Sequence, residues 1–185
     1  MIGYLGLARE TFDVSFAESK FKQGKKALLS ASSKTSGINY LVTNDQLSKN
    51  AFEFFGKKNF SKIIIFQTTF TDAQFILNFS KTINKPICIV AFPESRTGKR
   101  LRLNSVCGLN LGMHSLIKNN IYPDFIIFDT LLNLKKKIRS FILKDNTRNQ
   151  LNKWKQLDGK KIKEKIFIRA ISSQRPFRSL HPNSG

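Results

Sequence analysis

The residues best suited to chemistry gather in one stretch, residues 92–114. It follows an apolar run that stops at Pro93, crosses a polar loop and ends in a small-residue helix that carries His114. The loop holds one anion, Glu94, and four cations: Arg96, Lys99, Arg100 and Arg102. Arginine presents a planar fork of donors, so this loop could clamp an anion or a sugar hydroxyl. A solvated loop is the alternative, and composition alone leaves both open.

Other catalytic or metal-binding sets are not visible in the sequence. His114 and His181 are the two histidines, and no acidic pair lies at helical spacing beside either. Cys107 and His114 are seven residues apart, about 10 Å along a helix, which is too far for a hydrogen-bonded pair. No Walker-type lysine motif occurs, and the spacing of Gly3 and Gly6 indicates tight packing rather than a dinucleotide site. We therefore predict no catalytic residue and no metal ligand.

Length and composition favour one folded domain. The chain has 185 residues, 41% hydrophobic residues and 17 phenylalanines. No apolar run approaches the roughly 18 residues of a membrane span, and the apolar N-terminus lacks a cationic start and a cleavage site. Cys88 and Cys107 lack a Cys-x-x-Cys spacing and are predicted to be free thiols in a reducing compartment. These features indicate a cytoplasmic protein without a membrane partner.

The charge is large and uneven. The chain carries 32 Lys/Arg and 12 Asp/Glu, net +20, and residues 131–185 alone hold 15 cations and 3 anions, net +12. Such an excess attracts polyanions non-specifically. The basic helix over 135–165 lacks the interleaved aromatic residues of a single-strand binder, so we interpret it as a solvated face rather than a specific nucleic-acid surface.

Strand-like and helical segments alternate along the chain. The patterns predict strands at 2–8, 38–42, 62–66, 87–92 and 125–128, and helices at 16–31, 45–58, 72–83, 104–119 and 131–149. This alternation indicates an α/β fold, an open parallel five-stranded sheet with helices on both faces and the flavodoxin-like order 2-1-3-4-5. One edge of that sheet would collect Arg9 and Glu10 with residues 67–72 and 94–104. The domain is expected to span 1–158, and 159–185 to form an aborted start of a second domain followed by a disordered tail.

Three separated motifs carry a family resemblance. They are Gly6-Leu-Ala-Arg-Glu-Thr-Phe-Asp13, Gln67-Thr-Thr-Phe-Thr-Asp-Ala73, and Phe92-Pro-Glu-Ser-Arg-Thr-Gly-x-Arg-Leu-Arg-Leu-Asn-Ser-x-Cys-Gly-x-Asn-Leu. Together, over roughly residues 1–165, the chain resembles the N-terminal domain of the L-fucose/L-arabinose isomerase-like family. The resemblance implies a ketol isomerase of aldoses and ketoses, in which manganese bridges two substrate oxygens. It also implies a flavodoxin-like domain that packs against a neighbouring subunit and lends residues to that subunit's active site.

The resemblance assigns roles by motif position. Arg9 would contact the substrate, Glu94 and Arg96 would shape the pocket or subunit contact, and His114 would reach across the interface. His114 closes the segment Asn110-Leu-Gly-Met-His114, so Asn110 joins the expected substrate-binding set. The metal ligands of the family belong to later domains, which this sequence lacks, so the chain itself is expected to bind no cofactor.

The leading expectation is a truncated isomerase domain that is inactive alone and works as a homo-oligomer or with a missing C-terminal half. A stand-alone α/β module for a sugar or small anion is the first alternative. A basic polyanion-binding protein is the second. Neither the sugar nor the oligomeric state follows from the sequence.

Overall fold

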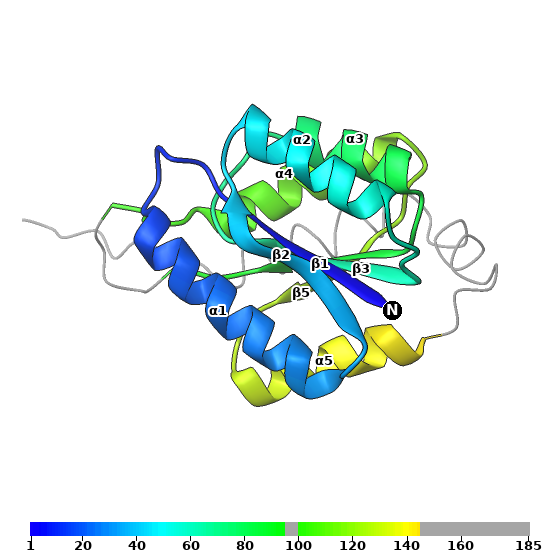
Figure 1. Cartoon of the computed structure of the whole chain (residues 1–185). Coiled ribbons are helices and arrows are strands. Elements are labelled where there is room, and N and C mark those ends of the chain that lie inside the picture. Colours follow the sequence, from blue (N-terminus) through cyan, green and yellow to red (C-terminus); the bar gives the residue numbers. More distant parts are fainter. Residues whose placement is uncertain (95–99, 145–185) are drawn as a thin grey trace, which may run out of the picture. The chain divides into compact units, whose positions relative to one another are not determined.

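A computed structural model of the chain describes residues 1–94 and 100–144 (Figure 1). The predicted domain limit at residue 158, the predicted tail and Arg96 lie outside these residues.

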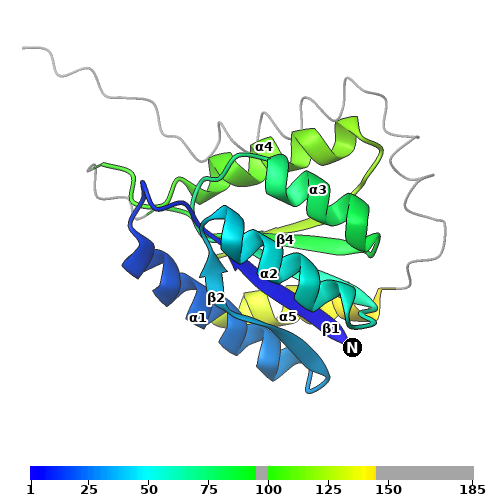
Figure 2. The ribbon, with the colours of Figure 1, turned by 45° about the horizontal axis from the view of Figure 1, so that its top comes forward.

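The predicted fold is confirmed. The parallel strands are ordered β2-β1-β3-β4-β5, and their bounds are β1 Ile2–Leu7, β2 Thr35–Val42, β3 Lys62–Gln67, β4 Ile87–Ala91 and β5 Asp124–Ile127. The helices are α1 Val14–Ala31, α2 Asp45–Gly56, α3 Gln74–Ile83, α4 Ser105–Lys118 and α5 Leu131–Leu143. Figures 1 and 2 show α1 and α5 on one face of the sheet and α2, α3 and α4 on the other. None of these helices is both long and apolar enough to cross a bilayer.

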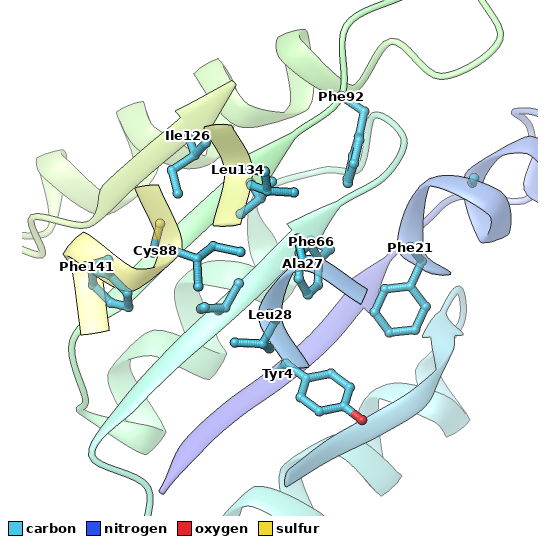
Figure 3. Close-up of a cluster of buried hydrophobic side chains, with 14 of the residues drawn as sticks. Tyr4, Phe21, Ala27, Leu28, Phe66, Cys88, Phe92, Ile126, Leu134 and Phe141 are labelled. Atoms are coloured by element: carbon cyan, nitrogen blue, oxygen red, sulfur yellow. The ribbon is translucent and has the colours of Figure 1, made fainter. Parts of the chain in front are cut away.

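The core consists of two apolar layers separated by the sheet. Every residue of β1, β3 and β4 is buried, as expected for parallel strands covered on both faces. Ile64 and Phe66 pack toward α1 and α5, whereas Ile63 and Ile65 pack toward the other three helices. Figure 3 shows the first layer, in which Phe66 lies among side chains from α1 and α5. The period of two along a strand thus divides one apolar run between both layers.

Two element boundaries differ from the sequence prediction by three residues or more. Strand β2 begins at Thr35 rather than residue 38, because its first residues pair with β1 at Ile2 and Gly3. Helix α5 ends at Leu143 rather than continuing to 149, and the backbone at Lys144 is extended. The buried ammonium of Lys62 donates to the carbonyl oxygens at this helix end, with Nζ–O distances of 2.7 Å to Phe141 and 2.9 Å to Ile142. Both corrections come from long-range partners.

The glycines near the N-terminus serve packing, as predicted. A Cβ on Gly3 would lie 2.7 Å from Phe55 Cε1, and one on Gly6 would lie 2.6 Å from Leu41 Cδ2. The side chains of Phe55 and Leu41 therefore fill the space beside these two glycines.

The two cysteines should differ in reactivity. Both are free; Cys88 is fully buried in β4 and Cys107 is exposed on α4. Burial raises the pKa of the Cys88 thiol well above its usual range, which keeps it protonated at neutral pH. A disulfide reagent should therefore label one thiol in the native protein and two after denaturation. Rapid native labelling of both, followed by mass spectrometry, would contradict this assignment.

Candidate functional site

The carboxyl ends of β1 and β3 are joined by two threonines. Thr68 donates to the Leu7 carbonyl from both its backbone N (3.0 Å) and its hydroxyl (2.6 Å). The backbone N of Arg9 donates to Thr69 Oγ1 at 2.8 Å. Both threonines are fully buried, whereas Arg9 is exposed. The backbone of Arg9 is therefore held in place while its guanidinium faces solvent.

The ends of β3 and β4 are joined to the start of α4 in a similar way. The Gln67 amide donates to Thr69 O at 2.7 Å. The Ser105 hydroxyl accepts from Phe92 N at 2.9 Å and donates to the Gln67 carbonyl. Among the described residues, no buried side-chain nitrogen or oxygen lacks a hydrogen-bond partner. This edge is a preorganised platform, because its polar groups already hold one another.

Glu94 closes the loop that follows β4. Its Oε1 accepts from the backbone N of Leu103 at 2.5 Å and of Asn104 at 2.6 Å. Asn104 has a φ of 51° and no side-chain capping bond, so Glu94 supplies the anionic group at the start of α4. Oε1 of Glu94 therefore has a structural role. A contact between Glu94 and a substrate stays a prediction.

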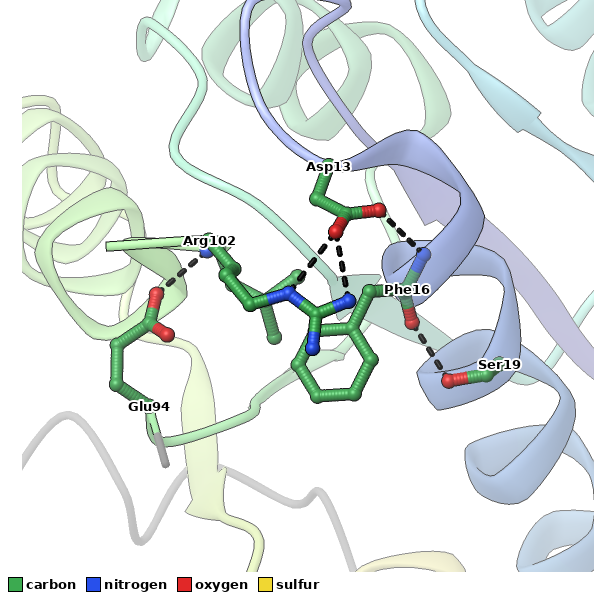
Figure 4. Close-up of polar contacts among 6 residues, drawn as sticks. Asp13, Phe16, Ser19, Glu94 and Arg102 are labelled. Atoms are coloured by element: carbon green, nitrogen blue, oxygen red, sulfur yellow. Dashed lines mark hydrogen bonds and ion pairs between the residues drawn. The ribbon is translucent and has the colours of Figure 1, made fainter. Parts of the chain in front are cut away.

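Arg102 ties the same loop to α1. Its Nε and an Nη donate to Asp13 Oδ2 at 2.9 and 2.7 Å, and its guanidinium carbon lies 3.9 Å from the centroid of the Phe16 ring (Figure 4). Asp13 Oδ1 accepts from Phe16 N at 2.9 Å and so caps α1. The backbone N of Phe16 and then the Arg102 guanidinium lower the pKa of Asp13. Arg102 is thus engaged in a fold contact and is a weaker candidate for an anion clamp.

Replacing Asp13 should separate its two roles. Asp13→Ala removes the cap and the ion pair and should lower the free energy of unfolding, mostly through loss of the cap. Asp13→Asn keeps a capping oxygen and loses only an exposed ion pair, so it should destabilise the fold much less than Asp13→Ala. The folded pKa lies below the unfolded one, so this stabilisation is complete above the unfolded pKa and is lost as pH falls through the folded pKa. Urea titrations at neutral and acidic pH measure both effects; equal losses in the two variants would contradict them.

A shallow hollow of about 300 Å³ opens beside the ion pair between Asp13 and Arg102. Its walls are two short segments, residues 11–13 and 100–102. Arg9 precedes the first segment and its backbone carbonyl accepts from Phe12 N at 3.0 Å. Arg9 and Arg100 are exposed, so they are the described cations best able to meet a ligand at this edge.

Asn110 and His114 lie on another surface. Both are exposed and four residues apart on α4, on the same helix face as Cys107. At 1.5 Å per residue they lie about 8 and 14 Å along the axis from Ser105 at the helix start. The structure therefore places Arg9 after β1 and Glu94 after β4, at the carboxyl ends of strands separated by β3, and Asn110 and His114 on an outer helix face. Arg96 lies outside the described residues.

The described residues do not fit a manganese site. Within residues 1–94 and 100–144, no three His, Cys, Asp or Glu side chains gather as ligands. Hard divalent cations need several converging oxygen or nitrogen donors. We therefore assign no chemical step to a metal ion bound by these residues.

Comparison with known proteins gives a distant match. No family model matches the sequence. The sulfoquinovose isomerases of Priestia aryabhattai and Priestia megaterium are each 23% identical to it over 125 residues. The chain is distantly similar to a sugar isomerase. The match covers 68% of this chain but 28% of each relative, so the activity of the whole relatives does not carry over directly.

Sequence reasoning did not assign roles to the residues that build this strand-end edge. Thr68 and Thr69 were placed at this edge, and Ser105 in a family motif, but none of the three was given a role of its own; hydroxyl residues directly after a strand, such as the two threonines, are a usable signal. Asp13 had the signal of an N-cap, since it precedes an amphipathic helix. Its pairing with Arg102, 89 residues away, had no local signal.

Proposed function

We propose that this chain is the N-terminal part of a sugar ketol isomerase of the fucose/arabinose type. In this proposal it supplies substrate-contacting and subunit-interface residues to an enzyme that interconverts aldoses and ketoses. The distant similarity to sulfoquinovose isomerases and the parallel sheet with its polar strand-end edge support the proposal.

The proposal rests mainly on the strand-end hydrogen bonds of Thr68 and Thr69, which fix the backbone of Arg9. Open α/β sheets bind ligands at the carboxyl ends of their strands. A guanidinium on an immobile backbone can donate to sugar hydroxyls at little entropic cost. The relatives are named for a sugar that carries a sulfonate, and Arg9 together with Arg100 would also suit such an anion. The substrate class is thus a neutral or sulfonated open-chain sugar.

The proposal divides labour within the complete enzyme. Manganese, bound by residues elsewhere, would supply the chemistry at the two substrate oxygens. This chain would orient the substrate through Arg9, with Glu94 holding the loop that borders it. Asn110 and His114 would meet another subunit, since they lie on an exposed helix face.

An activity assay tests the division of labour. The purified chain is mixed with manganese and a panel of pentoses, deoxyhexoses, hexoses and sulfoquinovose, and ketose formation is followed. We expect no turnover above a buffer control. Turnover that depends on this chain alone would contradict the proposal that the chain needs other parts of the enzyme for activity.

A binding titration tests the role of Arg9. Sugar added to the isotopically labelled protein should shift the amide signals of residues 7–9 and 68–69. Arg9→Ala should weaken this binding at least about tenfold, because a charge-assisted hydrogen bond contributes roughly 1.5–3 kcal/mol. Arg139→Ala, on α5, is the matched control and should change nothing. Unchanged affinity of Arg9→Ala for the sugar would show that Arg9 is not part of the binding site.

A stand-alone module for a sugar or anion is the second candidate, favoured by the hollow beside Arg100 within the described fold. Reading the downstream DNA in all frames separates the two proposals. Motifs of the metal-binding domains there would support an isomerase, and a module predicts that the surrounding DNA encodes none.

A further inference from the structure

Positive charge is divided unequally between the two helical layers. Helices α1 and α5 carry eight Lys/Arg and one Glu, net +7. Helices α2, α3 and α4 carry three Lys and two Asp/Glu, net +1. The two layers lie on opposite faces of the sheet (Figures 1 and 2). One side of the described fold is therefore strongly basic.

Leucines are exposed among these cations at helical spacing. We define the α1/α5 outer face by the side chains turned away from the sheet: Lys22, Lys26 and Leu29 on α1, and Leu132, Lys136, Arg139 and Leu143 on α5. They are three or four residues apart along each helix, opposite buried positions such as Leu134 and Ile138. The relative exposures of Leu29, Leu132 and Leu143 are 49%, 62% and 73%.

The two helices form one surface. They lie side by side on the sheet and share one core layer (Figure 1). Lys20 of α1 bridges toward α5, with its Nζ 5.9 Å from the ring of Phe128, just before that helix. Both helices follow parallel strands, so they run in the same direction across the same face of the sheet.

The cations of the outer face are available to a partner. On α5, Lys137 pairs with Asp129 at 3.3 Å, and beyond the helix end Lys144 pairs with Asp124 at 2.9 Å. Within the part of the chain that the structure describes, no carboxylate lies within ion-pair distance of the four outer-face cations. Nucleic acid would use such cations but has no use for protruding leucines, and this face presents no aromatic ring for stacking. An anionic bilayer would interact with both kinds of side chain. Its headgroups attract the cations, and the leucines can insert at the boundary between headgroups and acyl chains.

We propose that the α1/α5 outer face binds anionic phospholipid bilayers peripherally. The inference does not depend on the isomerase proposal, because it uses other residues and another face. Binding is expected to need both charge and the leucines. The sequence had suggested no membrane partner because it lacks a spanning segment, and peripheral contact requires none.

Vesicle sedimentation with the full chain tests this inference. The vesicles contain phosphatidylserine and phosphatidylcholine in equal amounts, or phosphatidylcholine alone. The triple variant Leu29→Gln, Leu132→Gln, Leu143→Gln should weaken binding to the anionic vesicles at least about tenfold, since burial of each CH₂ contributes to anchoring. The quadruple variant Lys22→Gln, Lys26→Gln, Lys136→Gln, Arg139→Gln should weaken it by several hundredfold, on the order of fivefold for each cation near an anionic surface.

Matched controls separate this face from bulk charge, which residues 145–185 also carry. Lys49→Gln, Lys57→Gln, Lys81→Gln, Lys118→Gln removes the same charge from the opposite layer, and Leu111→Gln removes an exposed leucine there. Both should bind within about threefold of wild type at physiological salt, where screening confines charge effects to groups near the surface. Circular dichroism checks that each variant is folded.

Three results would overturn the inference. Equal losses in the two quadruple variants would mean attraction by net charge alone. Unchanged binding in the leucine triple variant, with tighter binding to a DNA duplex than to vesicles, would mean a polyanion surface. Loss of a dimer in the leucine variant, without vesicle binding by wild type, would mean that a second copy covers this face.

Discussion

Gly37→Ala is expected to lower the free energy of unfolding by about 3 kcal/mol, the upper range for overpacking. A Cβ at this position would lie 2.2 Å from the backbone oxygen of Tyr4 and 2.5 Å from its Cγ. The backbone cannot withdraw freely, because Gly37 pairs with Tyr4 in the β1–β2 ladder beside a register irregularity. Relief therefore requires moving strand β2 away from the sheet.

Gly56→Ala is the matched control for that substitution. A Cβ on Gly56, at the end of α2, would meet nothing within 4 Å. Alanine favours helix, so this variant should be neutral or more stable by up to about 1 kcal/mol. Urea denaturation of both variants gives the comparison. A Gly37→Ala protein within about 0.5 kcal/mol of wild type would show that the strand pair yields easily.

Lys62→Met is expected to cost about 3 kcal/mol. Lys62 is 6% exposed, and its Nζ donates to the carbonyl oxygens of Phe141, Ile142 and Lys144. A cation at a helix C-terminus also interacts favourably with the helix dipole. Methionine keeps most of the volume but leaves these carbonyl oxygens without their charged donor, and hydrogen bonds to charged groups contribute roughly 1.5–3 kcal/mol.

Hydrogen exchange distinguishes this mechanism from general destabilisation. In Lys62→Met the amides in the last turn of α5 should exchange faster than those of β3, because that turn loses its anchor first. Lys85→Met is the control: Lys85 is exposed, and its amine donates to Asn59 Oδ1 across a long 3.4 Å. It should stay within about 0.5 kcal/mol of wild type. Uniform protection along α5 in Lys62→Met would argue against the anchoring role.

The order of elements and the sheet topology followed from the sequence. Unbroken apolar runs such as residues 63–66 in β3 belong to strands covered on both faces, and the intervening segments repeat apolar residues at helical spacing. Right-handed crossovers then leave few topologies. The position of Arg9 after β1 and of Glu94 after β4 also followed, because the carboxyl ends of parallel strands share one edge.

The roles of particular polar side chains were decided only by the tertiary structure. Arg102 was a predicted anion clamp, yet it pairs with Asp13. Glu94 holds the start of α4, and Lys62 ends α5. Periodicity reports which face of a segment is apolar, since that depends on near neighbours in the chain. A polar side chain's partner can lie 79 or 89 residues away, and only the stacking of strands and helices brings the two together.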